Sequence, residues 1–157
     1  IRQPDGVCLA YTDNGREYTG VEVLNWVRDA EERGAGEILL TSIDRDGTGS
    51  GYDLDLVRMV SAAVTIPVIA HGGASNTIHI TETIRSAGAD AVAIASMLHY
   101  AALNQNGSLL DKFEDEGNIE FLKKNSSFKI FGTENLNKVK RSLAKQKIPL
   151  RVLNDYG

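Results

Sequence analysis

The sequence is short of several features that identify particular classes of protein. It contains a single cysteine, Cys8, so no disulfide can form within the chain, and a reducing cytoplasm is the expected location. Basic residues are not in excess, because the formal net charge is -4, which argues against a nucleic-acid partner. No apolar run is long enough to span a membrane, and the first residues lack the pattern of a signal peptide.

What is present is the composition of an ordinary globular domain. The chain has 157 residues, of which 42% are hydrophobic and 24% are charged. This length corresponds to one domain and is sufficient for a hydrophobic core. We therefore treat residues 1–157 as a single domain.

The hydrophobic pattern predicts an α/β fold with a parallel sheet. A hairpin is expected first, because an Asn-Gly pair separates two short polar-apolar runs within residues 7–20. Apolar strands and amphipathic helices then alternate along the chain, as they do in βαβ units. The expected strands are 37–43, 68–73 and 91–100, and the expected helices are 21–34, 54–64, 75–87 and 131–147.

Particular residues are expected to end or cap these helices. Gly34 is expected to stop the first helix, and Ser75 and Thr133 to cap the third and the last. In the last helix, Leu136, Val139 and Leu143 are expected to face inward, leaving its basic residues on a solvated face. Between the third strand and this helix, residues 101–130 are polar and irregular but hold six scattered apolar residues, which predicts an insertion that covers another part of the domain.

Turns of small residues follow all three predicted strands. They comprise Gly47, Gly49 and Gly51, then Gly72, Gly73 and Ser75, and finally Ala95 and Ser96. Ligands of parallel α/β folds bind at the carboxyl ends of the strands, where these turns meet. Main-chain N–H groups that small side chains leave uncovered, together with helix N-termini, favour anions. The three turns therefore predict a site for a phosphate-sized anion.

Two acids in the first turn do not suit that anion. Asp44 and Asp46 would repel a phosphate, so at least one of them is expected to have another task. Either carboxylate could accept hydrogen bonds from the Gly47–Ser50 turn, as aspartates often do. Alternatively, Asp46 could act as a general acid–base or accept hydrogen bonds from substrate hydroxyls. The spacing alone leaves both interpretations open.

Three motifs resemble the cyclase subunit of imidazole glycerol phosphate synthase. They are ERGAGEILLTSIDRDGTGSGYD, PVIAHGGAS and AGADAVAIASMLHY, and the resemblance covers about residues 1–100 and the end KVKRSLAKQKIPLRV. The resemblance implies part of a (β/α)8 barrel. It also implies a phosphorylated ribonucleotide substrate and ammonia from a glutaminase partner. The implied products are imidazole glycerol phosphate and an aminoimidazole carboxamide ribotide, formed without a cofactor or a metal.

The resemblance also assigns roles to individual residues. Asp46 would be the catalytic acid–base, and Glu37 would lie in the gate through which ammonia enters the barrel. Thr41 and His71 would lie in the substrate pocket, although His71 occupies a position where the family usually has Ser. The residues implied in phosphate binding are Gly47, Gly72, Gly73, Ala95 and Ser96. His99 also matches a family position, but a hydrogen-bonded histidine in the core is the expected role.

The chain departs from the family in ways that leave other functions open. It is expected to hold only the C-terminal half of the barrel, with strands six to eight and no counterpart of the catalytic Asp on the first strand. Its partner would then be the missing half-barrel or a second copy of itself. The 101–130 insertion, longer than the family's usual link, allows a relative that supplies ammonia for amidating a surface-polysaccharide sugar. A non-catalytic phosphate-binding half-barrel is the third interpretation.

Overall fold

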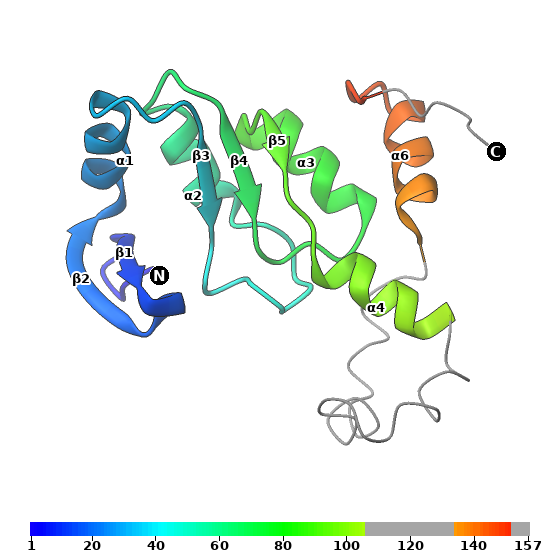
Figure 1. Ribbon diagram of the computed structural model, residues 1–157, viewed down its shortest axis with the longest axis horizontal. Coiled ribbons are helices and arrows are strands. Elements are labelled where there is room, and N and C mark those ends of the chain that lie inside the picture. Colours follow the sequence, from blue (N-terminus) through cyan, green and yellow to red (C-terminus); the bar gives the residue numbers. More distant parts are fainter. Residues whose placement is uncertain (106–133, 152–157) are drawn as a thin grey trace.

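A computed structural model of the protein describes residues 1–105 and 134–151 (Figure 1). Its elements along the chain are β1 (Leu9–Thr12), the 3-10 turn η1 (Asp13–Gly15), β2 (Glu17–Glu22), α1 (Val23–Glu32), β3 (Ile38–Thr41), α2 (Leu54–Ser61), β4 (Val68–His71), α3 (Thr77–Ala87), β5 (Ala91–Val92), α4 (Ser96–Gln105) and α6 (Leu136–Lys145). The alternation of strand and helix confirms the predicted α/β class.

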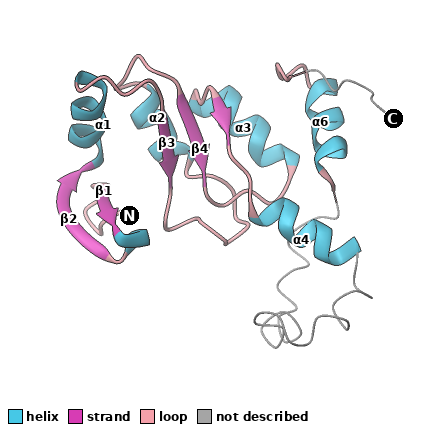
Figure 2. Cartoon of the chain, in the orientation of Figure 1, coloured by secondary structure: helices cyan, strands magenta, loops and turns pink. Residues whose placement is uncertain are grey.

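The sheet that positions the site has three parallel strands in the order β3-β4-β5. Helices α2 and α3 pack against one another, with α2 against β4 and α3 against β5. Both lie on the same side of the sheet (Figure 2). A separate antiparallel hairpin, β1-β2, precedes α1 as the Asn-Gly pair predicts, and Asn14 has a positive φ of 53°.

The core lies between the sheet and these helices. Val60 of α2, Val68 and Ala70 of β4, and Ile80 of α3 are almost completely buried. The other face of the sheet is not covered by the described residues, and the side chain of Leu39 in β3 is 61% exposed. Both faces of β3 are apolar, but within the described part of the chain only one of them is buried.

The third predicted strand is wrong over most of its length. Only Ala91 and Val92 pair with β4, and helix α4 begins at Ser96. A continuous apolar run cannot be assigned to strand or helix by periodicity alone. Met97 and Ala101, four residues apart, are the buried positions, as expected on one side of a helix. His99 lies away from that side, so its side chain is exposed rather than in the core.

Residues 101–105, the first five of the segment predicted to be irregular, belong to helix α4. The rest of that segment lies outside the described residues, which resume at residue 134.

The predicted helix caps are also corrected. Asn76 caps α3, because its side-chain oxygen accepts from the N–H groups of Ile78 and His79, whereas the hydroxyl of Ser75 donates to Gly49. Asn135 caps α6 by accepting from Lys138, so the helix begins after the position expected for Thr133. Within α6, Val139 and Leu143 are buried as predicted, but Leu136 is 45% exposed because it is the first residue of the helix.

Candidate functional site

All five residues implied in phosphate binding line one small cavity at the carboxyl ends of the three parallel strands. Its lining comprises Asp46, Gly47, Gly49, His71, Gly72, Gly73, Ala74, Ala93, Ile94, Ala95 and Ser96. The turns after β3, β4 and β5 meet here because parallel strands end at the same edge of the sheet. Thr41 does not line this cavity, but its Oγ1 lies 3.1 Å from Nδ1 of His71, which does.

Main-chain donors around the cavity are available to a ligand. In the described part of the chain, the N–H groups of Gly47, Gly72 and Gly73 donate no hydrogen bond. The same holds there for the N–H groups of Ala95 and Ser96, at the start of α4. Such groups at turns and at a helix start carry partial positive charge and bind anions. The cavity is therefore suited to a negatively charged oxygen group.

The two adjacent glycines are also required by the packing of the turns. Gly72 and Gly73 have φ angles of 93° and 102°. A Cβ atom on Gly73 would lie 2.2 Å from the carbonyl oxygen of Gly51, and one on Gly72 would lie 2.7 Å from that of Ser42. The N–H of Gly51 donates to the Gly73 carbonyl over 2.8 Å, which holds the two turns together. The sequence predicts a ligand role for these glycines, but it gives no sign of this close approach.

The cavity is small. Its volume is about 10 Å³, which is about the space that one water occupies. One wall is the segment 44–53, which we call the Asp46 loop. Ser75 donates from its hydroxyl to the Gly49 carbonyl over 2.7 Å and holds the middle of this loop inward. A phosphate is larger than one water, so enclosing a phosphate within the cavity would require Gly47–Gly51 to move outward.

The three acids of the Asp46 loop differ in their partners. Asp44 accepts a hydrogen bond from the main-chain N–H of Arg2 over 2.7 Å, and Asp53 pairs with the Arg2 guanidinium. The carboxylate of Asp46 has neither a hydrogen bond nor an ion pair with any described residue, and its side chain is exposed. Asp46 is thus the acid of this loop that is free to act on a ligand.

The local interpretation, in which Asp44 or Asp46 bonds to the Gly47–Ser50 turn, is wrong. Thr48 takes that role, because its hydroxyl donates to the Arg45 carbonyl over 2.7 Å and accepts from the N–H of Ser50 over 3.2 Å. Arg45 contributes a guanidinium hydrogen bond to the Ser50 hydroxyl. Thr and Ser side chains form such local turns readily, which leaves the nearby carboxylates available for other partners.

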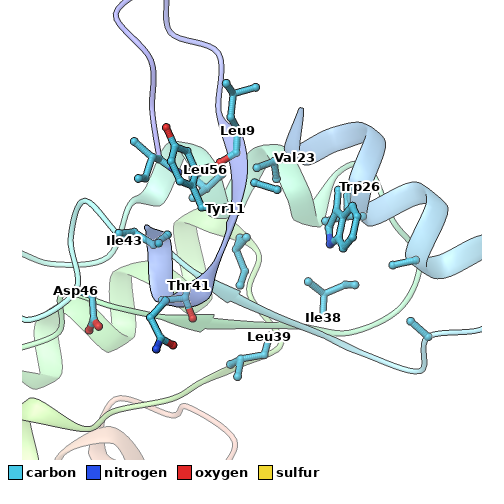
Figure 3. A pocket seen from close by; sticks show the side chains of 18 of the residues that line it. Leu9, Tyr11, Val23, Trp26, Ile38, Leu39, Thr41, Ile43, Asp46 and Leu56 are labelled. Atoms are coloured by element: carbon cyan, nitrogen blue, oxygen red, sulfur yellow. Dashed lines mark hydrogen bonds between the residues drawn. The ribbon is translucent and has the colours of Figure 1, made fainter. Parts of the chain in front are cut away.

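A second, larger hollow runs along the free edge of β3 (Figure 3). Its volume is about 720 Å³, and most of its lining comes from the hairpin, α1 and β3. Thr41 and Asp46 lie at one end of it, and Trp26, which is 54% exposed, lies toward the other. Glu37 also lines this hollow and directly precedes β3, at the end of the strand opposite Asp46. Asp46 therefore lines both the hollow and the anion cavity.

Tyr52 connects the Asp46 loop to the last strand of the sheet. Its buried hydroxyl donates to the Ala93 carbonyl over 3.1 Å, and burial raises the pKa of Tyr52, so it remains a neutral donor.

Among the described residues, no group of three or more His, Cys, Asp or Glu side chains could hold a metal ion. Within the same residues, no helix is long and apolar enough to cross a membrane.

Comparisons with known proteins identify similar sequences. The family described as Histidine biosynthesis protein matches residues 5–104. Over 94 residues, or 60% of this chain, the sequence is 55% identical to the imidazole glycerol phosphate synthase subunit HisF of Pyrobaculum aerophilum. It is 50% identical to the protein of the same name from Trichormus variabilis, and 48% identical to that from Nostoc sp., again over 94 residues. The matched region covers 37%, 37% and 36% of these relatives.

Proposed function

The chain belongs to the histidine biosynthesis protein family, and we propose that it is part of the cyclase subunit of an imidazole glycerol phosphate synthase. In this proposal a phosphorylated ribonucleotide binds at the strand ends. Ammonia from a glutaminase partner then closes an imidazole ring, which yields imidazole glycerol phosphate and an aminoimidazole carboxamide ribotide. The names of the relatives favour this substrate over a surface-polysaccharide sugar. The cytoplasmic location expected from the single cysteine stays a prediction.

The position of Asp46 carries the proposal. Its carboxylate, which has no partner among the described residues, lies between a cavity lined by main-chain donors and a hollow large enough for the rest of a substrate. A phosphate bound by Gly47, Gly73 and Ser96 would place the attached ribose or its ring-opened form toward Asp46. A carboxylate at that point can take up a proton and return it as the ring closes, which is general acid–base catalysis. The other interpretation of Asp46, as an acceptor for substrate hydroxyls, is compatible with the same position.

His71 and Thr41 are proposed to complete the substrate pocket. Their contact engages Nδ1 of the His71 ring, and Nε2 has no hydrogen-bond partner among the described residues. Nε2 of His71 can donate to a phosphate oxygen when Nδ1 accepts from the Thr41 hydroxyl, or when both ring nitrogens are protonated, whereas the Ser that the family usually has there would donate from a hydroxyl. We propose that His71 is a donor to the anion in this chain.

The free edge of β3 supports a half-barrel. The matched region spans little more than a third of the relatives' length, and one face of the three-stranded sheet has exposed apolar side chains. We propose that further parallel strands pair with this edge and close a (β/α)8 barrel, which removes unpaired strand edges. The hollow along β3 would then belong to the barrel interior, and Glu37 would lie at its ammonia entrance.

The turnover of a completed barrel tests this function. We define the chimera as this chain joined to the part of the P. aerophilum relative that lies outside the matched region. The chimera is expected to form imidazole glycerol phosphate from the ribonucleotide and ammonium salts. The 157-residue chain alone is expected to be inactive, because it provides only one of the acids that the proposed reaction needs. Turnover by the isolated chain, or none by a folded chimera that binds the substrate, would contradict the proposal.

Self-association is expected in the absence of the remaining strands. A second copy could cover the free edge of β3 and the exposed Leu39, most simply as a two-fold dimer. Light scattering across a dilution series should give a dimer mass that falls toward that of a monomer. Leu39→Lys should favour the monomer. Ile78→Lys serves as the control, because Ile78 is 62% exposed but lies on α3 outside the hollow. A monomer at every concentration would contradict this expectation.

A further inference from the structure

Arg2 contacts both ends of the Asp46 loop. Its main-chain N–H donates to Oδ2 of Asp44 over 2.7 Å. Its guanidinium nitrogen Nη2 donates to Oδ1 and Oδ2 of Asp53 over 3.0 and 3.2 Å. These residues are 42 and 51 positions apart from Arg2 in the sequence, so the contacts are tertiary. One residue of the N-terminal segment thereby joins the first and last residues of the loop.

The contact with Asp53 differs from an ordinary surface ion pair. The side chain of Asp53 is 11% exposed, and its Oδ1 also accepts from the N–H of Leu56, which caps α2. Burial and a helix cap fix the carboxylate, so a cation bound to it loses less freedom than one at a mobile surface partner. The hydrogen bond with Asp53 and the charge of Asp53 raise the pKa of Arg2, so the guanidinium stays charged.

The two ends of the loop are thus held by contacts with Arg2, which the middle of the loop does not share. Asp46 lies two residues after Asp44 and close to the fixed first end. Gly47 and Gly49 have positive φ angles, and the middle is held inward by the Ser75–Gly49 and Gly51–Gly73 hydrogen bonds. Opening the anion cavity requires these bonds to break while Asp46 keeps its position. A loop with a fixed base and a glycine-rich middle meets both requirements.

We propose that Arg2 is a positioning residue that fixes the base of the Asp46 loop, so that the middle can open for a phosphate without displacing Asp46. The contacts concern the loop itself, whereas the benefit to substrate binding rests on the function proposed above. Arg2 acts through Asp44 and Asp53 and does not line the anion cavity. No feature of the sequence singled it out.

Hydrogen exchange on the 157-residue chain tests the loop directly. In Arg2→Met, which keeps an unbranched side chain without charge, the amides of Thr48, Ser50 and Gly51 should exchange about five- to ten-fold faster. The amides of β4 should be unchanged, because a local opening does not involve the core. Asp53→Asn should behave in the same way, since asparagine retains the α2 cap. Arg2→Lys should restore part of the protection, because the charge remains but the planar fork is lost.

Arg33→Met is the matched control. Arg33 pairs with Asp29 over 2.7 Å on the exposed side of α1, so its replacement removes an Arg–Asp pair without touching the Asp46 loop. Its loop amides should exchange as in the wild type. If Arg2 instead stabilised the whole fold, the exchange rates of the loop amides and of the β4 amides in Arg2→Met would rise together. That result, or unchanged loop exchange in both Arg2→Met and Asp53→Asn, would overturn the proposal.

Titration with inorganic phosphate separates this proposal from the proposed function. If the wild type binds phosphate, Arg2→Met should weaken binding by about three- to ten-fold, and Arg2→Lys by less. If the wild type does not bind phosphate, the proposed function fails, while the exchange rates still decide the role of Arg2. If Arg2→Met does not fold, Asp53→Asn and Arg2→Lys decide it by the same comparison.

Discussion

Replacing Asp46 with asparagine should lower the ammonia-dependent turnover of the chimera by about 10²- to 10⁴-fold, the usual contribution of general acid–base catalysis. Asparagine has nearly the same shape, but it cannot take up and return a proton. Because Asp46 has no partner among the described residues, the change leaves no other group unpaired. Phosphate affinity should therefore be unchanged or slightly higher, since a negative charge beside the anion is removed.

Asp55→Asn is the control for that substitution. Asp55 is an exposed carboxylate that pairs with Arg58 on α2, away from the anion cavity. Its replacement removes the same charge and should leave turnover within about two-fold of the wild type, because an exposed ion pair contributes little. Wild-type turnover in Asp46→Asn would show that another group transfers the proton.

The second large effect is expected on stability. Gly73→Ala should lower the free energy of unfolding by about 2–5 kcal/mol, because alanine is strained at positive φ and its Cβ would overlap the Gly51 carbonyl. Denaturation in urea measures this change. Gly36→Ala is the control, since no atom lies within 4 Å of its Cβ position and its φ is not positive. It should be neutral or slightly stabilising. A Gly73→Ala protein as stable as the wild type would contradict the close approach of the two turns.

This packing decides which substitution can test the anion site. A larger residue at Gly73 would disturb the fold before it reached a ligand, so loss of phosphate binding would have two explanations. Gly47 is better suited, because its φ is 73° and no atom lies within 4 Å of its Cβ position. Gly34 has the same two properties, with a φ of 96°, but follows α1 far from the cavity in the chain. Gly47→Ala and Gly34→Ala therefore impose similar backbone strain, but only Gly47→Ala changes a residue of the anion cavity.

The fold was largely predictable because local patterns and tertiary structure agree in it. The alternation of apolar runs with amphipathic segments predicts the parallel strands β3 and β4 and the helices α1 to α3, and the Asn-Gly pair predicts the hairpin. The run 91–100 failed because it is apolar at nearly every position, so its periodicity is uninformative. Ser75 failed as a cap because it and Asn76 are both suitable residues, and only the position of Gly49 in space decides between them.

The candidate site was predictable where small residues follow strands, and not where contacts are distant in sequence. Gly47, Gly73 and Ser96 meet because topology brings the ends of adjacent parallel strands together. Nothing in the spacing of Asp44, Asp46 and Asp53 distinguishes the acids that hold Arg2 from the one that has no partner in the described part of the chain. That distinction depends on a residue more than forty positions away, which a local pattern cannot contain.

Phosphate titration of the isolated chain, followed through its main-chain amide NMR signals, tests the central claim most directly. We expect saturable shifts at Gly47, Gly73 and Ser96, because these donors surround one cavity at three strand ends. Alanine is strained at the positive φ of Gly47, and relief of that strain turns the N–H of residue 47 away from the anion. Gly47→Ala should therefore weaken binding about ten-fold, the effect of losing one hydrogen bond to a charged group worth roughly 1.5 kcal/mol. Gly34→Ala should bind as the wild type does, at a similar cost in stability of about 1 kcal/mol. Shifts that do not saturate, or that saturate away from these three residues, would contradict a substrate-phosphate site in this chain.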